Sequence, residues 1–277
     1  VDLQQSLEKL AAERAAAIGP HVSAAIMVVE TVTGDVKASV GTAGLFDEKR
    51  AGFIDMTRAV RSPGSTLKPF IYGLAFESGI AHPETLVEDR PTAFDGYTPQ
   101  NFDKVFHGTV SVREALSESL NVPAIQVLEL VGPARLVSRF RRAGVEARLP
   151  DMSSANLAVG LGGVGLTLND LATLYTALAR GGRPIALSER VGAIGPATPP
   201  KPLMDERAAA YVTDILAGRL GATKGDVRVA IKTGTSYGYR DAWAMGYDGR
   251  YVVGVWVGRP DGAPLPGLMG VDVAVPI

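Results

Sequence analysis

The sequence predicts an α+β fold whose antiparallel sheet is built from the two ends of the chain. Two hairpin patterns support this prediction: the first pairs residues 24–31 with 36–40, and the second pairs 242–247 with 250–257. In each pattern, two apolar runs flank a short turn that contains glycine, which is typical of antiparallel strands. The residues between the two hairpins carry helix signals instead. This distribution favours one shared sheet with helices packed against it.

The first element is predicted to be an amphipathic helix over residues 4–18, which ends before Gly19-Pro20. Apolar residues recur at helical spacing among charged ones in this segment. They are Leu7, Leu10, Ala11 and Ala15. Because a helix with one apolar stripe must bury that stripe, we expect this helix to pack on the sheet.

Two capping boxes predict helices in the middle of the chain. Ser111 and Glu114 have the spacing at which a serine hydroxyl and a glutamate satisfy the first backbone N–H groups of a helix. They predict a helix over residues 112–120. Thr167 and Asp170 form the second box and open another helix.

Glycine and proline mark the ends and connections of this middle region. Gly181-Gly182 end the second helix. Residues 160–165 contain four glycines, but they lack the Lys-Ser/Thr ending of a phosphate loop, so we interpret them as a closely packed turn. Residues 192–202 are rich in proline and glycine and are predicted to be a loop or a connection between lobes.

Composition excludes several functional classes. A chain of 277 residues that is 46% hydrophobic is long and apolar enough for a large core. A net charge of −1 gives no electrostatic reason to expect nucleic acid as a partner. Without cysteine there is no thiolate nucleophile, and three widely spaced histidines give no pattern for a metal site. We therefore expect neither metal nor cofactor.

No segment of the sequence predicts a membrane span. The apolar run 24–29 is far shorter than the ~20 residues that a spanning helix needs. The chain does not begin with methionine and shows no signal-peptide pattern, which indicates an excised fragment. We expect any anchor or signal to lie outside this sequence.

The first chemical motif is Ser65-Thr66-Leu67-Lys68, which places a hydroxyl and an amine on one face of a helix. Pro63-Gly64 precede it. Pro69 has no amide hydrogen, so it fits only within the first turn of that helix. Ser65 is therefore predicted to lie at the helix N-terminus, where its free backbone N–H suits an oxyanion donor.

Lys68 is the nearest base for Ser65, because no histidine is adjacent. A lysine acts as a base only when neutral, so its pKa must fall from ~10.4 toward about 7 to 8. Burial and a second cation both lower a lysine pKa. That cation is available in Lys232-Thr233-Gly234-Thr235, which follows apolar residues on a predicted strand. We expect Gly234 to let a substrate backbone approach closely.

The third motif is Ser119-Leu120-Asn121, which supplies a hydroxyl and an amide. It lies where the helix over 112–120 must end, because Pro123 restricts the residue before it. We therefore expect the serine and the asparagine of this motif on a turn.

The chain also contains two similar patterns that we interpret as structural. Ser6 and Lys9 have the spacing of the first motif, but they lie within the amphipathic helix and have no positioned helix N-terminus. Ser154 and Asn156 have the spacing of the third motif and lie beside the glycine turn. This second pair is the stronger rival.

The three motifs in this order resemble the signature of penicillin-binding proteins and class A β-lactamases. Longer runs are similar to the transpeptidase domain of bifunctional class A penicillin-binding proteins. These runs are residues 61–70, 99–102, 116–124 and 232–243. The last of them resembles the 1C subtype in particular.

The resemblance covers residues 24–257 and implies a single transpeptidase domain over 1–277. It implies an antiparallel sheet flanked by helices together with an all-helical lobe, and a site in the cleft between the lobes. On this basis we expect the sheet lobe at about residues 20–60 and 205–260, and the helical lobe at about 70–180.

The resemblance also implies a role for each motif residue. Ser65 would be the acylated nucleophile and Lys68 its base. Ser119 would relay a proton to the leaving amine, and Asn121 would hold the substrate amide. Lys232 would tune Lys68 and Ser119 electrostatically.

The remaining implied roles concern substrate binding. Thr233 and Thr235 would bind the terminal carboxylate of a D-Ala-D-Ala stem peptide or a β-lactam, with Gly234 between them. The backbone N–H groups of Ser65 and Thr235 would form the oxyanion hole. The resemblance implies D,D-transpeptidase activity at the periplasmic face of the bacterial inner membrane. The membrane anchor and the glycosyltransferase domain of such proteins are absent from this sequence and are expected outside it.

Three alternative functions share these motifs. A class A β-lactamase would need a Glu-x-x-x-Asn element, and none of the four asparagines has a glutamate four residues before it. They are Asn101, Asn121, Asn156 and Asn169. D,D-carboxypeptidase activity is a second alternative, because the sequence does not show whether water or an amine takes the acyl group. A β-lactam-binding sensor or scaffold domain without turnover also stays open.

Overall fold

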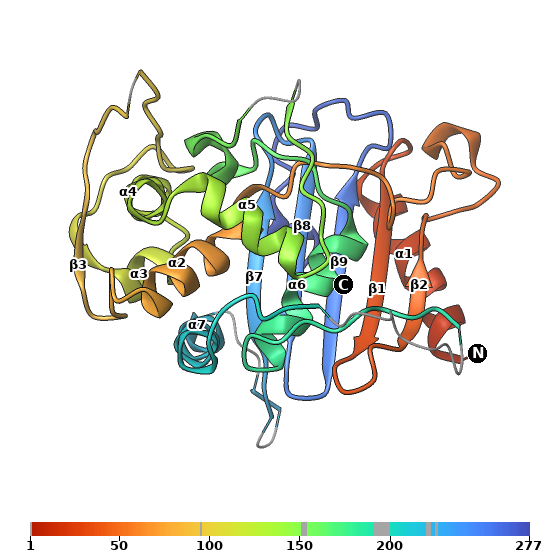
Figure 1. Ribbon diagram of the computed structural model, residues 1–277. Coiled ribbons are helices and arrows are strands. Elements are labelled where there is room, and N and C mark those ends of the chain that lie inside the picture. The colour runs from red at the N-terminus through yellow and green to blue at the C-terminus, as the bar shows by residue number, and fades with distance from the viewer. Residues whose placement is uncertain (1, 95, 151–153, 191–199, 220–222, 225–226) are drawn as a thin grey trace.

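The computed structural model describes residues 2–94, 96–150, 154–190, 200–219, 223–224 and 227–277. Its centre is a five-stranded antiparallel sheet with the strand order β2-β1-β9-β8-β7 (Figure 1). The strands are β1 (Ser23–Glu30), β2 (Val36–Val40), β7 (Ala230–Thr235), β8 (Asp241–Tyr247) and β9 (Tyr251–Gly258). Both predicted hairpins are present, and β1 of the first pairs with β9 of the second. The prediction of one shared sheet is therefore confirmed.

Helices cover both faces of this sheet. On one face, α1 (Asp2–Ile18) and α8 (Gly270–Val273) share a hydrophobic cluster with Ile26 of β1. On the other face, α6 (Leu168–Ala179) lies over the sheet, and Met27 of β1 points into the main core (Figure 1). Because both faces are buried, β1 is apolar at consecutive positions and shows no alternation. The predicted packing of the first helix on the sheet is confirmed.

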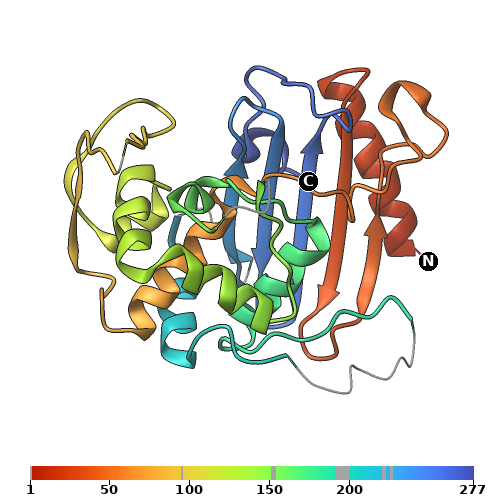
Figure 2. The ribbon, with the colours of Figure 1, turned by 45° about the horizontal axis from the view of Figure 1, so that its top comes forward.

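The second lobe surrounds a central buried helix. It contains α2 (Lys68–Glu77), α3 (Val112–Ser117), α4 (Asn121–Val131), α5 (Pro133–Arg142) and α7 (Glu206–Arg219). Every residue of α2 from Lys68 to Phe76 is buried, because α4, α7 and α5 pack around it (Figure 2). In the described part of the chain, no helix has the length and apolar character needed to span a bilayer.

This lobe is not entirely helical, which corrects the expectation. A two-stranded antiparallel sheet lies at its outer edge, formed by β3 (Leu86–Asp89) and β4 (Gly108–Ser111). The pairing joins segments about twenty residues apart, and each strand is only four residues long, so local pattern does not reveal it. A second short pair consists of β5 (Thr223–Lys224) and β6 (Val227–Arg228). In addition, α6 falls in the range expected for the helical lobe but packs on the sheet.

The capping boxes are present, but one helix is shorter than predicted. The Ser111 hydroxyl accepts a hydrogen bond from the backbone N–H of Glu114 at 3.1 Å, and α3 ends at Ser117 instead of residue 120. It ends early because Ser119 has a left-handed backbone with φ +60°. The box at Thr167 opens α6 as predicted. Of the predicted loop 192–202, residues 192–199 lie outside the described part of the chain.

The sheet and the second lobe meet where a short 3-10 helix, η2 (Gly64–Leu67), packs against β7. Gly64 has φ +52°, and a Cβ atom on it would lie 2.6 Å from the carbonyl oxygen of Thr235. A Cβ atom on Gly234 would lie 2.7 Å from the carbonyl oxygen of Pro63 and 2.7 Å from Cγ2 of Thr66. At either position these distances are too short for a residue with a Cβ atom. The two glycines therefore allow this close approach.

This contact gives Gly234 a packing role that the sequence analysis did not predict. The space beside its Cα atom is filled by the η2 turn of the same chain, so its lack of a side chain serves internal packing.

We predict that Gly234→Ala lowers the free energy of unfolding by about 1–3 kcal/mol, because the added methyl group must push η2 away from β7. The matched control is Gly249→Ala in the exposed β8–β9 turn, where nothing lies within 4 Å of an added Cβ atom. We expect that variant to stay within about 0.5 kcal/mol of the parent. Urea unfolding measures both values. Equal stability of the two variants would contradict the close-packing account.

Candidate active site

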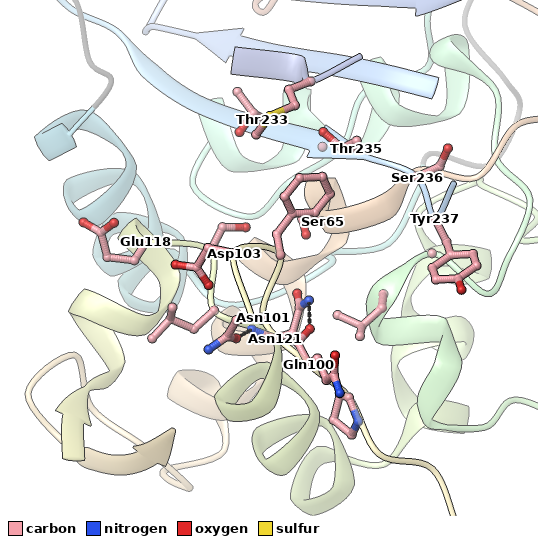
Figure 3. A pocket seen from close by; sticks show the side chains of 18 of the residues that line it. Ser65, Gln100, Asn101, Asp103, Glu118, Asn121, Thr233, Thr235, Ser236 and Tyr237 are labelled. Carbon is pink, nitrogen blue, oxygen red and sulfur yellow. Dashed lines mark hydrogen bonds between the residues drawn. The ribbon is translucent and has the colours of Figure 1, made fainter. Parts of the chain in front are cut away.

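Ser65 lies on η2, one turn before α2 begins at Lys68. The carbonyl oxygen of Ser65 accepts the backbone N–H of Lys68, and Pro69 occupies the first turn of α2 as predicted. The helix start is therefore a 3-10 turn that continues into an α-helix. Ser65 is half-buried and lines a cavity of about 1000 Å³ between the two lobes. In Figure 3, Ser65 lies between Thr235 of β7 and Asn121 of α4.

The Ser119-Leu120-Asn121 motif forms the connection between α3 and α4. Ser119 adopts the left-handed conformation, which is strained for a residue with a side chain. Two backbone hydrogen bonds hold the turn: the Ser119 N–H donates to Leu116 and the Leu120 N–H donates to Ala115. Asn121 is the first residue of α4. The turn places the Ser119 hydroxyl in the interior, beside the amines of Lys68 and Lys232.

Lys68 is fully buried, and its amine contacts the Ser119–Asn121 turn. Its Nζ atom lies 2.5 Å from the carbonyl oxygen of Ser119, 2.6 Å from Oδ1 of Asn121 and 3.4 Å from the Ser119 hydroxyl. Among the residues the structure describes, none of its hydrogen bonds goes to Ser65. A neutral amine has two hydrogens and one lone pair. Two oxygen acceptors take both hydrogens of neutral Lys68 and leave its lone pair to accept a proton.

Lys232 approaches the same serine from the opposite side. Its side chain is 3% exposed, and its Nζ atom donates to the Ser119 hydroxyl at 2.8 Å and to the Thr233 carbonyl at 2.9 Å. Lys232 and Gly234 point into the protein from β7, whereas Thr233 and Thr235 are half-buried on the alternate positions. The Ser119 hydroxyl thus lies between two buried amines.

The electrostatics of the site favour a neutral Lys68. Burial, followed by the positive charge of Lys232, lowers the pKa of Lys68 well below its ordinary value. The carboxylate of Asp89 opposes this effect. The predicted coupling between the two lysines therefore has a physical basis in the structure, with burial as the larger cause.

The hydroxyls of Thr233 and Thr235 line the same cavity from β7 (Figure 3). The Thr235 hydroxyl oxygen accepts the backbone N–H of Gly270 at 3.2 Å, at the start of α8. An oxygen that accepts from the protein keeps its own O–H free to donate to a ligand. The arrangement suits an anionic group that lies along β7.

All eight residues predicted for the site lie in or directly beside this cavity. They are Ser65, Lys68, Ser119, Asn121, Lys232, Thr233, Gly234 and Thr235. Sequence reasoning missed the polar residues behind Asn121, which include Asp89 and Asn101. The run 99–102 was noticed but received no role, and Asp89 has no local signal.

The four residues of the two rival patterns are not among those that line this cavity. Ser6 and Lys9 are exposed on α1, on the far side of the sheet. Ser154 is exposed, and the Asn156 side chain accepts the backbone N–H of Ala158 as a cap for η4 (Leu157–Leu161). Within the described ranges, no three histidine, aspartate or glutamate side chains gather in a way that could hold a metal ion.

Comparisons with known proteins identify the family of the chain. A sequence profile described as the penicillin-binding protein transpeptidase domain matches residues 24–261. Penicillin-binding protein 1C of Escherichia coli is 44% identical over 282 residues, which is 99% of this chain and 36% of that protein. Penicillin-binding protein 1B of Vibrio cholerae is 30% identical over 95% of this chain and 36% of its own length.

Solved structures share the fold. The PonA1 protein of Mycobacterium tuberculosis, solved in complex with penicillin V, has a TM-score of 0.81 at 22% identity, over 98% of this chain and 81% of that chain. Penicillin-binding protein 1A of Haemophilus influenzae has a TM-score of 0.74 at 19% identity, over 90% and 45% of the two chains.

The chain spans about a third of the length of the curated relatives that it matches. The profile covers most of the chain, and its residues 24–261 include every residue of the candidate site. The chain belongs to the family of penicillin-binding protein transpeptidase domains.

Proposed function

We propose that this domain is a serine D,D-transpeptidase that cross-links peptidoglycan stem peptides through an acyl-enzyme at Ser65. The observation that carries the proposal is the Ser119 hydroxyl, which is held between two buried amines in the same cavity that Ser65 lines. Proton transfer in a water-poor site is what a serine nucleophile without histidine requires. Stem peptides and β-lactams are the partners, and the periplasmic face of the inner membrane is the location.

In the acylation step, each polar group of the site has one role. The Ser65 oxygen attacks the carbonyl carbon of the penultimate D-Ala, and neutral Lys68 takes the hydroxyl proton. The backbone N–H groups of Ser65 and Thr235 stabilise the oxyanion. When the bond to the terminal D-Ala breaks, its nitrogen receives a proton through Ser119, which Lys68 and Lys232 both contact.

The second step reverses this proton flow. The amine of a second stem peptide attacks the ester carbonyl, gives its proton back through Lys68, and forms the new amide as Ser65 leaves. Thr233 and Thr235 hold the carboxylate of the donor or of a β-lactam during the first step, through charge-assisted hydrogen bonds. One N–H of the Asn121 amide stays available for the substrate, because the other donates to the carbonyl of Gln100 at 2.6 Å.

We predict that a fluorescent penicillin forms a stable ester at Ser65, because a β-lactam carries the carboxylate and the strained amide that this site acts on. Peptide mapping of the labelled protein locates the adduct. Ser65→Ala should lose labelling, whereas Ser6→Ala should label like the parent, because Ser6 lies on the exposed face of α1. Undiminished labelling of Ser65→Ala would refute the assignment of the nucleophile.

We further predict that an acyl group donated by a D-Ala thioester is transferred to an added D-amino acid amine. Mass spectrometry of the products separates the three functions that share Ser65. An amide product that increases with amine concentration supports transpeptidation. Hydrolysis alone indicates a carboxypeptidase, and an acyl-enzyme that persists without product indicates a sensor or scaffold.

A further inference from the structure

A buried carboxylate lies behind the catalytic residues and has no part in the steps above. Asp89, the last residue of β3, is fully buried. Its Oδ2 atom accepts the backbone N–H of His107 at 2.8 Å and lies 3.1 Å from the ring Nδ1 of that residue. A buried carboxylate costs folding free energy unless several donors surround it. The hydrogen bonds of Asp89 indicate what this carboxylate does in the site.

Asp89 fixes the orientation of the Asn101 amide. The Nδ2 atom of Asn101 donates to both carboxylate oxygens, at 2.9 and 2.7 Å, and to the Val105 carbonyl at 2.8 Å. All these partners are acceptors, so the amide nitrogen must face them. The Oδ1 atom of Asn101 therefore points the other way, where it accepts the backbone N–H of Asn121 at 2.7 Å.

The same loop fixes the side chain of Asn121. Its Nδ2 atom donates to the carbonyl of Gln100, the neighbour of Asn101 (Figure 3). This contact sends Oδ1 toward Lys68, whose Nζ atom lies 2.6 Å away. A continuous hydrogen-bonded chain thus runs from Asp89 through Asn101 and Asn121 to Lys68.

We propose that Asp89 and Asn101 are positioning residues of this site, which act by holding Asn121 against Lys68. This inference rests on the proposed function of Lys68 as the base for Ser65. Without Asn101, the backbone N–H of Asn121 loses its acceptor, and the start of α4, which presents Oδ1 of Asn121 to Lys68, loses one of its anchors. Asp89 also acts through space, because its negative charge raises the pKa of Lys68 and opposes Lys232.

The test measures the rate constant for acylation by fluorescent penicillin. Asn101→Ala and Asp89→Asn should each lose about 10- to 100-fold, because a displacement of about 1 Å in a catalytic group has an effect of this size. Glu88→Gln is the matched control, since Glu88 precedes Asp89 on β3 and its exposed carboxylate accepts hydrogen bonds from Arg90 and Thr109. It should stay within about twofold of the parent. Rates are expressed per folded site, counted by labelling at saturation.

A double-mutant cycle separates positioning from general damage to the fold. If Asn101 acts through Asn121, the variant with both Asn101→Ala and Asn121→Ala should react no more slowly than Asn121→Ala alone. If the loss in the double variant equals the product of the losses in the two single variants, the proposal is overturned. This cycle uses Asn101, so it stays decisive if Asp89→Asn fails to fold.

The pH dependence gives a readout that a purely structural role would not move. The groups whose charge acts on Lys68 are Lys232 on β7 and Asp89 on β3, and the titratable Tyr72, one turn further along α2, also interacts with the charge of Asp89. Asp89→Asn removes the one negative charge among these three, so the pKa of Lys68 should fall and the acid limb of the acylation rate should move to lower pH. Asn101→Ala should leave the limb in place. An unmoved limb in Asp89→Asn would overturn the role of Asp89.

Failure of this inference is distinguishable from failure of the proposed function. If parent protein forms no ester at Ser65, the proposed function fails. If parent and both variants label Ser65 at equal rates, the proposed function stands and the positioning role of Asp89 and Asn101 is wrong.

Discussion

Two lysine amines buried on either side of one serine hydroxyl form the interaction on which the rest of the site depends. Water would solvate both amines and keep both protonated, so the chemistry requires that the protein exclude it. Burial and the positive charge of Lys232 lower the pKa of Lys68, while Lys232 donates to the Ser119 hydroxyl and to the Thr233 carbonyl. In the proposed function, the neutral base and the proton relay both depend on this burial.

The fold holds these groups together although they come from distant parts of the chain. The α2 helix carries Lys68 in the centre of the second lobe, and β7 carries Lys232 at the edge of the sheet. The strained Ser119 turn lies between them, with its hydroxyl in contact with both amines. Gly64 and Gly234 permit the close packing of η2 against β7. Stability and catalysis are therefore linked at this contact.

Much of the fold and of the site was predictable, because the signals are local. The two hairpins, the capping box at Thr167 and the spacing of Ser65 and Lys68 each lie within a few residues of sequence. The contacts that stayed hidden are those that only tertiary packing creates. Asp89 meets Asn101 across an intervening loop, and the space beside Gly234 is filled by a turn about 170 residues earlier in the chain. No periodicity or spacing records either contact.

The proposed role of Lys68 as a base requires that its amine be neutral in the folded protein. Lysines labelled with carbon-13 at Cε report their protonation by NMR, and Lys68→Met identifies the resonance of this residue. We predict that this resonance titrates well below the usual lysine value of about 10.4, and that its midpoint moves upward in Lys232→Ala, because one repelling charge is gone. A Lys68 resonance that titrates at the ordinary value in the folded parent would contradict the account.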